Sequence, residues 1–307
     1  MRFVLLCTAL LLAAPHGSLA QSDRYEGPIV DVHVHAYARI QSANRFCFPQ
    51  PCEGAATQLS SGDELKPATI ATMEQAGIVV GVLSGTSANV AAWTADNEDR
   101  FIRGIFIRDP STIDLAELRR QIVSGQVQVV GEILSQYAGI AADDPRLDPV
   151  FALAHELDVP VHIHLAGLGG SADFRSDLGN PLRLVPVLGK YPGLRIYIEN
   201  ASWPFVEEVT SLMYQYPSVY ADISTVLHLF SPEVAQRHLR NLTESGLGKR
   251  LMFGSDQMSW PEVMGEAIGV IQDADFLTRE QKADILYNNA AEFFRFTDRV
   301  IAEHHRR

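Results

Sequence analysis

Five residues, Asp31-Val32-His33-Val34-His35, end an apolar run near the start of the chain. Alternate residues of an extended strand share a face, so Asp31, His33 and His35 are expected to project together. Two neutral imidazoles at this spacing suit zinc and the neighbouring divalent metals. The same pattern also fits two buried, hydrogen-bonded histidines at a strand end. The choice between these interpretations depends on which other residues reach the same place.

Apolar β-branched runs alternate with segments of helical periodicity along the rest of the chain. Continuous apolar runs indicate strands covered on both faces, and their alternation with helices indicates a parallel sheet. Eight such units predict a single-domain α/β fold, the (β/α)8 TIM barrel. A doubly wound open sheet is the alternative, but its glycine-rich first turn is missing. The expected strands span residues 29–35, 78–83, 101–107, 127–133, 159–165, 194–198, 219–223 and 250–253.

Residues 1–20 have the pattern of a secretory signal. Arg2 supplies a short basic region, an apolar stretch follows, and Ser18-Leu19-Ala20 offers small residues for cleavage. We expect cleavage after Ala20, export to the periplasm or beyond the cell, and a mature domain of residues 21–307. The apolar stretch is shorter than a membrane-spanning helix needs, so no membrane partner is expected after cleavage. A retained N-terminal anchor is the alternative.

Two cysteines, Cys47 and Cys52, lie close together in a proline-bearing segment. In an exported protein such a pair is expected to form a disulfide bond. A two-cysteine metal site is the alternative, but it would need further thiol or imidazole ligands nearby, and the segment supplies none.

The charge balance restricts the class of partner. Of the 25 basic residues only Arg2 precedes the cleavage site, so the mature chain carries 24 basic and 37 acidic residues, a net charge of −13. Nucleic-acid binding requires clustered Lys and Arg to displace counterions, so a nucleic-acid partner is excluded. The expected partner is a small-molecule substrate. The sequence does not indicate an oligomeric state.

Imidazoles and carboxylates follow directly on several of the predicted strands. The carboxyl ends of barrel strands open on one face, so residues there meet in space although they are far apart in sequence. Burial of unpaired charge is costly, and a bound cation would offset that cost. These strand-end residues are His33 and His35 from the first strand, Glu132 from the fourth, His162 and His164 from the fifth, Glu199 and Asn200 from the sixth, and Asp256 from the eighth.

Four ordered motifs support this interpretation: Asp31-Val-His-Val-His, Pro160-Val-His-Ile-His164, Phe253-Gly-Ser-Asp256 and Tyr287-Asn-Asn-Ala-Ala-Glu-Phe-Phe. Together they resemble the amidohydrolase superfamily, in the amidohydrolase-related branch called amidohydrolase 2, over nearly all of the mature chain. The resemblance implies a metal-dependent (β/α)8 hydrolase. Its implied metal ligands are His33, His35, Glu132 at a bridging position, His164 and Asp256.

The resemblance also implies a reaction, the hydrolysis of an amide, ester or lactone carbonyl. A metal-activated water would attack the carbonyl, and Asp256 would act as the general base.

His162, two residues deeper than His164, is expected to pack in the interior or support a ligand. His228, in the loop after the seventh strand, is a candidate substrate contact, with an exposed loop histidine as the alternative.

One position departs from the pattern of the family. Relatives usually carry a further histidine after the sixth strand, where this chain has Asn200. A neutral amide is a weak metal ligand, so one divalent ion per chain, expected to be Zn2+, is favoured over two. Strand alternation would point Asn200 inward with Ile196 and Ile198. We expect Asn200 to bind substrate.

Two other functions fit the same residues. The first is decarboxylation or hydration of a small carboxylated substrate, because the same metal can hold a carboxylate, and Arg39, Arg45 and Arg175 are loop candidates for binding the anion. The second is a catalytically degenerate ligand-binding barrel, in which the missing histidine reflects lost catalysis.

Overall fold

The computed structural model describes residues 23–41, 59–169 and 173–307. The predicted signal segment, Arg45 and the Cys47 and Cys52 pair lie outside these ranges. None of the helices among the described residues is both long enough and apolar enough to cross a membrane.

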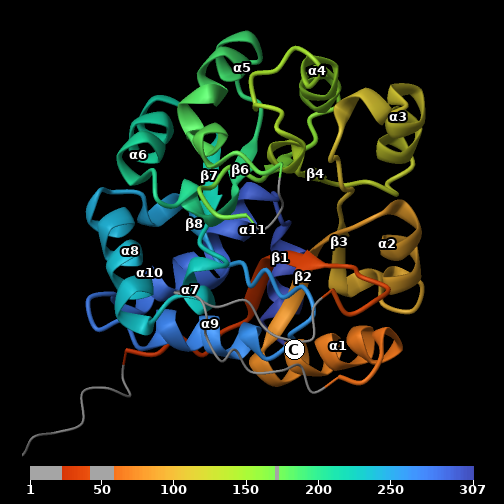
Figure 1. Ribbon diagram of the computed structural model, residues 1–307. Coiled ribbons are helices and arrows are strands. Elements are labelled where there is room, and N and C mark those ends of the chain that lie inside the picture. The colour runs from red at the N-terminus through yellow and green to blue at the C-terminus, as the bar shows by residue number, and fades with distance from the viewer. Residues whose placement is uncertain (1–22, 42–58, 170–172) are drawn as a thin grey trace, which may run out of the picture.

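Eight parallel strands surround a common axis in the described part of the chain (Figure 1). They pair in the orders β1-β2-β3 and β4-β5-β6-β7-β8. The strands are β1 (Ile29–His35), β2 (Ile78–Ser84), β3 (Phe101–Arg103), β4 (Val130–Ile133), β5 (Val161–Ile163), β6 (Ile196–Ile198), β7 (Val219–Asp222) and β8 (Leu251–Met252).

Backbone hydrogen bonds connect these two groups of strands at both edges. Ile105 N–H donates to the carbonyl of Gly131 at 2.7 Å, between β3 and β4. Val32 N–H donates to the carbonyl of Phe253 at 2.9 Å, between β1 and β8. The sheet is therefore closed, which confirms the (β/α)8 barrel and excludes the open sheet.

Some ladders are shorter than the apolar runs that predicted them. The run 127–133 contributes only β4, because Gln128 N–H and Val129 N–H both donate to the carbonyl of Arg103 instead of pairing in register. The chain bends at residues 128 and 129, so the regular ladder begins only at Val130.

Helices follow the strands and cover the outside of the barrel (Figure 1). The longer helices bury apolar residues on one side. In α3 these are Leu118 and Ile122, and the Asp114 side chain accepts from the backbone N–H groups of the first turn. The helices are α1 (Leu65–Ala76), α2 (Ser87–Thr94), α3 (Leu115–Val123), α4 (Asp148–Glu156), α5 (Val185–Lys190), α6 (Val206–Gln215), α7 (Val226–Leu229), α8 (Pro232–Glu244), α9 (Val263–Gln272), α10 (Arg279–Ala283), α11 (Asn289–Phe293) and α12 (Asp298–His304).

A column of stacked rings connects the strand-end histidines to the C-terminal helices. His33 meets His162 edge-on at 4.6 Å between centroids, and His162 lies flat on Tyr197 at 4.2 Å. Tyr197 then meets the edge of Phe293 in α11 at 5.5 Å. All four side chains are buried, so the site rests on a packed floor.

Candidate metal centre

Four ligand atoms from three strand ends converge at one point of the barrel. The Nε2 atom of His33 lies 3.6 Å from both Glu132 Oε2 and Asp256 Oδ1. The Nε2 atom of His35 lies 3.8 Å from Glu132 Oε2 and 2.6 Å from Asp256 Oδ1. Ligands about 2.1 Å from a tetrahedral metal are themselves about 3.4 Å apart, so most of these separations match a shared ion.

Two of the four atoms are buried without a hydrogen-bond partner among the described residues, His33 Nε2 and Glu132 Oε2. An imidazole lone pair and a carboxylate oxygen left in this state would cost free energy. A divalent cation would satisfy both at once. The residues present therefore fit a metal ion, and the primary position is defined here as His33, His35, Glu132 and Asp256.

The tautomer of His33 is set by Asp222 and Ser224, which lie on the Nδ1 side of its ring. Its Nδ1 lies 3.4 Å from Asp222 Oδ2 and 3.2 Å from Ser224 Oγ. The carboxylate only accepts hydrogen bonds, so Nδ1 carries the ring proton and Nε2 presents its lone pair to the primary position. Burial alone would lower the pKa of His33, but surrounding carboxylates, Asp256 first, raise it well above its usual range. The carboxylates around His33 therefore favour a positive charge at this ring, carried by a proton or by a bound cation.

His35 is fixed by contacts of a different kind. Its backbone N–H donates to Gln257 Oε1 at 2.9 Å, and its ring stacks on Tyr37 at 5.1 Å with an interplanar angle of 9°. Phe106 lies against the same ring, 5.5 Å away. These contacts fix the orientation of the imidazole while its Nε2 faces Asp256.

Asp256 enters the site from the segment after β8 with a left-handed backbone, φ 49°. Its N–H donates to the carbonyl of His33 at 2.9 Å, and its Oδ2 accepts from the hydroxyl of Thr225. Burial would raise the pKa of Asp256, but His33 and His35 hold it below its usual range. The carboxylate is therefore ionised and keeps Oδ1 facing the two imidazoles.

Gly254 allows the segment after β8 to lie close to His33. A Cβ at Gly254 would lie 2.8 Å from the Cβ of His33, closer than real Cβ contacts. The glycine in Phe253-Gly-Ser-Asp256 therefore lets the segment after β8 cross directly behind the β1 histidine.

Glu132 faces two groups of ligands. Its Oε2 points to the primary position, while its Oε1 lies 3.4 Å from His164 Nδ1. Burial would raise the pKa of Glu132, but hydrogen bonds with His164 and His33 hold it well below its usual range. The structure thus places Glu132 between the β1 and β5 histidines, as the bridging position requires.

The sixth strand differs from the expectation. Glu199, and not Asn200, reaches the site, with its Oε2 2.5 Å from His164 Nδ1. The predicted inward set was wrong, because Ile196 and Ile198 pack in the outer core while Tyr197 stacks on His162. Odd-numbered residues of this strand therefore face inward, and the carboxylate of Glu199 lies where the amide of Asn200 was expected.

Asn200 turns aside because its backbone is left-handed, φ 56°. Its side-chain oxygen accepts from Thr225 N–H at 2.7 Å and from Ser224 Oγ at 3.2 Å, and its amide donates to Glu199 Oε1 at 2.8 Å. The side chain is 1% exposed. It is engaged within the protein, which gives no support to the predicted contact with substrate.

The other predicted polar residues are distributed as follows. His162 is buried in the ring column with its Nε2 3.5 Å from Asp222 Oδ2, consistent with packing or support. His228 is half-buried in α7 and belongs to none of the ligand groups. Arg175 pairs with Asp177 on the surface at 2.6 Å. Arg39 is exposed.

Aromatic rings surround both histidine groups, and sequence reasoning did not single them out. Tyr37 and Phe106 flank His35, while Tyr137 lies 4.8 Å from His164 between ring centroids. Burial raises the pKa of both tyrosines, so their hydroxyls stay protonated and able to donate. Arg108, an exposed side chain with no ion pair among the described residues, lies over the Tyr137 ring at 5.5 Å.

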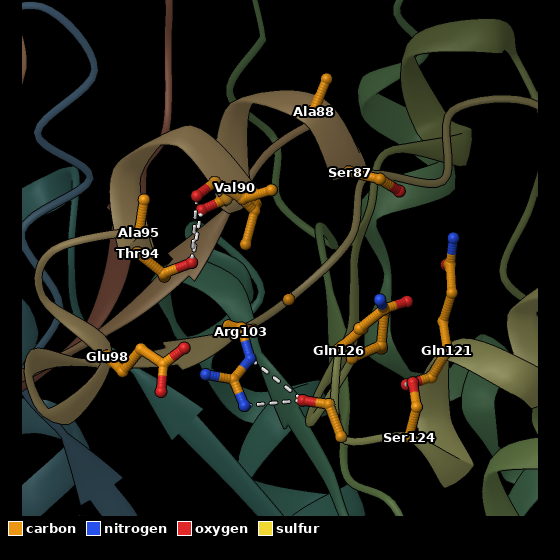
Figure 2. Close-up of a pocket in the computed structure, with 14 residues that line it drawn as sticks. Ser87, Ala88, Val90, Thr94, Ala95, Glu98, Arg103, Gln121, Ser124 and Gln126 are labelled. Carbon is orange, nitrogen blue, oxygen red and sulfur yellow. Dashed lines mark hydrogen bonds between the residues drawn. The ribbon is translucent and has the colours of Figure 1, made fainter.

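A cavity of about 700 Å3 lies elsewhere, between α2 and α3. Figure 2 shows Arg103 at its edge, donating twice to the carbonyl of Gly125, at 3.0 and 2.7 Å. Its lining contains none of the candidate ligands. The cavity is thus separate from the metal centre.

A family model described as amidohydrolase matches residues 30–296, which is most of the chain. The chain therefore belongs to the amidohydrolase family, in the amidohydrolase 2 branch. Members of this branch are metal-dependent enzymes that act as hydrolases or decarboxylases.

Two solved structures share the barrel. A probable 2-pyrone-4,6-dicarboxylic acid hydrolase from Acinetobacter baumannii, with citric acid bound, has a TM-score of 0.61 at 16% identity, covering 87% of this chain and 99% of that one. A dihydroxybenzoic acid decarboxylase from Polaromonas sp. JS666, with bound manganese and the inhibitor 2-nitroresorcinol, has a TM-score of 0.58 at 14% identity, covering 88% and 97%. At these identities the similarity shows the fold.

One sequence relative, Protein fluG from Emericella nidulans, is 25% identical over 154 residues. The alignment covers 45% of this chain and 18% of that protein. The chain thus spans less than a fifth of the length of this relative.

Proposed function

We propose that the protein is a metal-dependent hydrolase of an amide, ester or lactone carbonyl, with one Zn2+ in the primary position. The observation that carries the proposal is the convergence of two imidazoles and two carboxylates on one point, where His33 Nε2 and Glu132 Oε2 have no hydrogen-bond partner in the described part of the chain. A bound divalent ion would acidify a water molecule and polarise the scissile carbonyl.

The proton of the attacking water would then be transferred by a side chain of the protein. Asp256 is ionised and within reach of the same point, so it would accept the proton of the attacking water and return it to the leaving group. The hydroxyl of Thr225 holds Oδ2, so Oδ1, which lies 2.6 Å from His35 Nε2, would be the oxygen that exchanges the proton. The rings of Tyr37 and Phe106 lie against His35, whose side chain is buried.

A second candidate is the decarboxylation of an aromatic carboxylate. It is favoured by the rings of Tyr37, Phe106 and Tyr137 around the site, which offer flat surfaces to a planar substrate. It is also favoured by the guanidinium of Arg108, which lies over the Tyr137 ring and could bind a carboxylate. The catalytically degenerate barrel was suggested by the missing sixth-strand histidine, and the carboxylate of Glu199 beside His164 supports an enzyme over it.

The test compares Zn2+-loaded and chelated protein on a panel of aryl esters, lactones, anilides and hydroxybenzoates. We expect hydrolysis by the loaded protein only, and a loss of about 10²- to 10⁴-fold in kcat for Asp256→Asn. Asp177→Asn, which removes an exposed carboxylate, is the matched control and should retain activity. Release of CO2 without hydrolysis would select the second candidate, and a loaded protein inert to the whole panel would contradict an enzyme.

A further inference from the structure

We propose that Asn200 and Thr225 form a positioning pair for Asp256, in which Asn200 fixes Thr225 and the hydroxyl of Thr225 holds one carboxylate oxygen of Asp256. The other oxygen alone then faces the primary position. The inference deepens the proposed function and rests on it, because it names the residues that orient the general base. It also assigns a role to Asn200, the position that departs from the pattern of the family.

The hydroxyl of Thr225 is not used to cap a helix. Thr225 precedes α7, and a threonine at this position usually accepts a hydrogen bond from an N–H group of the first turn. Its backbone is already helical, φ −57° and ψ −34°, and its side chain caps no N–H group among the described residues. Instead the hydroxyl donates to Asp256 Oδ2, which connects the segment after β7 to the segment after β8.

The backbone of Thr225 is held on both sides. Its N–H donates to the side-chain oxygen of Asn200 at 2.7 Å, and its carbonyl accepts from the N–H of Leu229 at 2.8 Å. Asn200 is itself fixed, because its N–H donates to Asp222 Oδ1 at 3.0 Å and its side-chain amide donates to Glu199 Oε1 at 2.8 Å. The hydroxyl of Thr225 is therefore presented from a fixed backbone.

The bond from Thr225 gives the two oxygens of Asp256 different surroundings. Oδ2 accepts from the hydroxyl, while Oδ1 lies 2.6 Å from His35 Nε2 and 3.6 Å from His33 Nε2. The last torsion of an aspartate is broad, and a carboxylate can bind a cation through one oxygen or through both. With Oδ2 held, Asp256 keeps one orientation and offers one oxygen.

Loss of the hydroxyl should therefore change the site more than the fold. Thr225→Val keeps the branched shape of the side chain, but it removes the donor to Asp256 Oδ2. The freed oxygen can then turn toward the primary position and bind the ion together with Oδ1. Groups that orient a ligand through a hydrogen bond typically contribute about 10- to 100-fold to metal affinity or activity. Thr225→Ser keeps the hydroxyl and should behave as the wild type.

Asn200→Gly tests the other member of the pair. Residue 200 is left-handed, φ 56°, a conformation that glycine adopts readily, so this variant removes the side chain and keeps the backbone. Thr225 then loses the acceptor of its N–H, and its hydroxyl is held less firmly against Asp256. Both variants act on the same carboxylate, so their effects should not add. In a protein that already carries Thr225→Val, Asn200→Gly should change little.

The measurements use the full chain, loaded with Zn2+ for kinetics and with Co2+ for visible absorption, which needs no substrate. Thr225→Val should lower kcat on the best substrate of the panel by about 10- to 100-fold with little change in KM. Its Co2+ absorption should weaken, because the visible bands of Co2+ lose intensity as the number of ligands rises. The matched control is Thr94→Val, which removes a buried hydroxyl that donates to the carbonyl of Val90 at 2.9 Å and should change neither quantity.

The outcomes separate this inference from the proposed function. A wild-type kcat or a wild-type Co2+ spectrum for Thr225→Val would overturn the positioning role, and so would a Thr225→Ser variant as impaired as Thr225→Val. If Thr225→Val does not fold, Thr225→Ser and Thr225→Ala give the same comparison, because they also differ by one hydroxyl. A wild type that binds Co2+ but hydrolyses nothing would overturn the proposed function, while the spectra would still decide the role of Thr225. A protein that binds no divalent ion would overturn both.

Discussion

At the scale of single residues, the primary position depends on lone pairs that other groups direct. Asp222 and Ser224 orient His33 through Nδ1, and Gln257 with Tyr37 orients His35 through its backbone and ring face. Neither histidine relies on the other for its orientation. Each imidazole should therefore contribute separately to metal affinity.

This independence predicts the effect of removing either ligand. His33→Ala or His35→Ala should each lower bound Zn2+ from about one to well below one per chain at micromolar metal, because a coordinate bond is lost. Metal content after gel filtration measures the change. His155→Ala removes an exposed histidine on α4 and should leave the metal content unchanged. Full metal retention by the double variant of His33 and His35 would refute the site.

The meeting of His33, His35 and Asp256 at the strand ends was predictable from sequence, because strand alternation and the barrel topology fix where these side chains point. Glu199 was missed for a local reason. Residues 200–202 are left-handed, a conformation that Asn adopts but that no pattern of residue types imposes on Ala201 or Ser202. The turn changes which residue of the Glu199-Asn200 pair faces the site, and only coordinates reveal it.

At the scale of elements, α8 packs against the left-handed turn at residues 200–202, which follows β6. Its buried His238 hydrogen-bonds to the backbone of Asn200, and burial lowers the pKa of His238 to about 4. The folded state therefore requires the neutral imidazole. In the unfolded chain this histidine titrates near its ordinary value of about 6.5.

The sign of the resulting pH dependence follows from this difference. The unfolded chain binds the proton first, so the stability contributed by neutral His238 is complete above about pH 6.5 and is lost as the pH falls toward 4. Between pH 7 and pH 5 the wild type should lose about 2 kcal/mol more unfolding free energy than His238→Gln, which keeps a donor but does not titrate. Urea unfolding at both pH values measures the difference, and equal losses would contradict it.

Most elements were visible in the sequence because eight apolar runs can close only a few ways. The lengths of the strands were predicted less accurately from the sequence. Val127 and Val129 continue the apolar pattern of β4, yet the N–H of Val127 donates to the carbonyl of Gln121, and the N–H groups of Gln128 and Val129 share the carbonyl of Arg103. The signal segment and the disulfide of Cys47 and Cys52 lie outside the described residues and stay predictions.

At the scale of the whole molecule, negative charge is gathered inside the barrel as well as on the surface. Five carboxylates are buried around the strand ends: Asp31, Glu132, Glu199, Asp222 and Asp256. Burial raises the pKa of Asp31 to about 7 even though Ser255 and the N–H of His33 donate to it. These carboxylates raise the pKa of His33 and of His164, so positive charge on the two rings offsets part of the negative charge, and bound cations would offset more.

Metal binding should therefore stabilise the whole fold, since the ligands converge only when all strand ends are in place. At a free Zn2+ concentration 100 times its Kd, linkage adds about 2.7 kcal/mol of unfolding free energy. For a domain of this size we expect the Tm to rise by about 5 to 10 °C over chelated protein. Scanning calorimetry with Zn2+ and with chelator measures the shift, and the double alanine variant of His33 and His35 should lose most of it. Equal Tm values for loaded and chelated wild type would show that the buried carboxylates and imidazoles balance one another without an ion, and the metal centre would have to be abandoned.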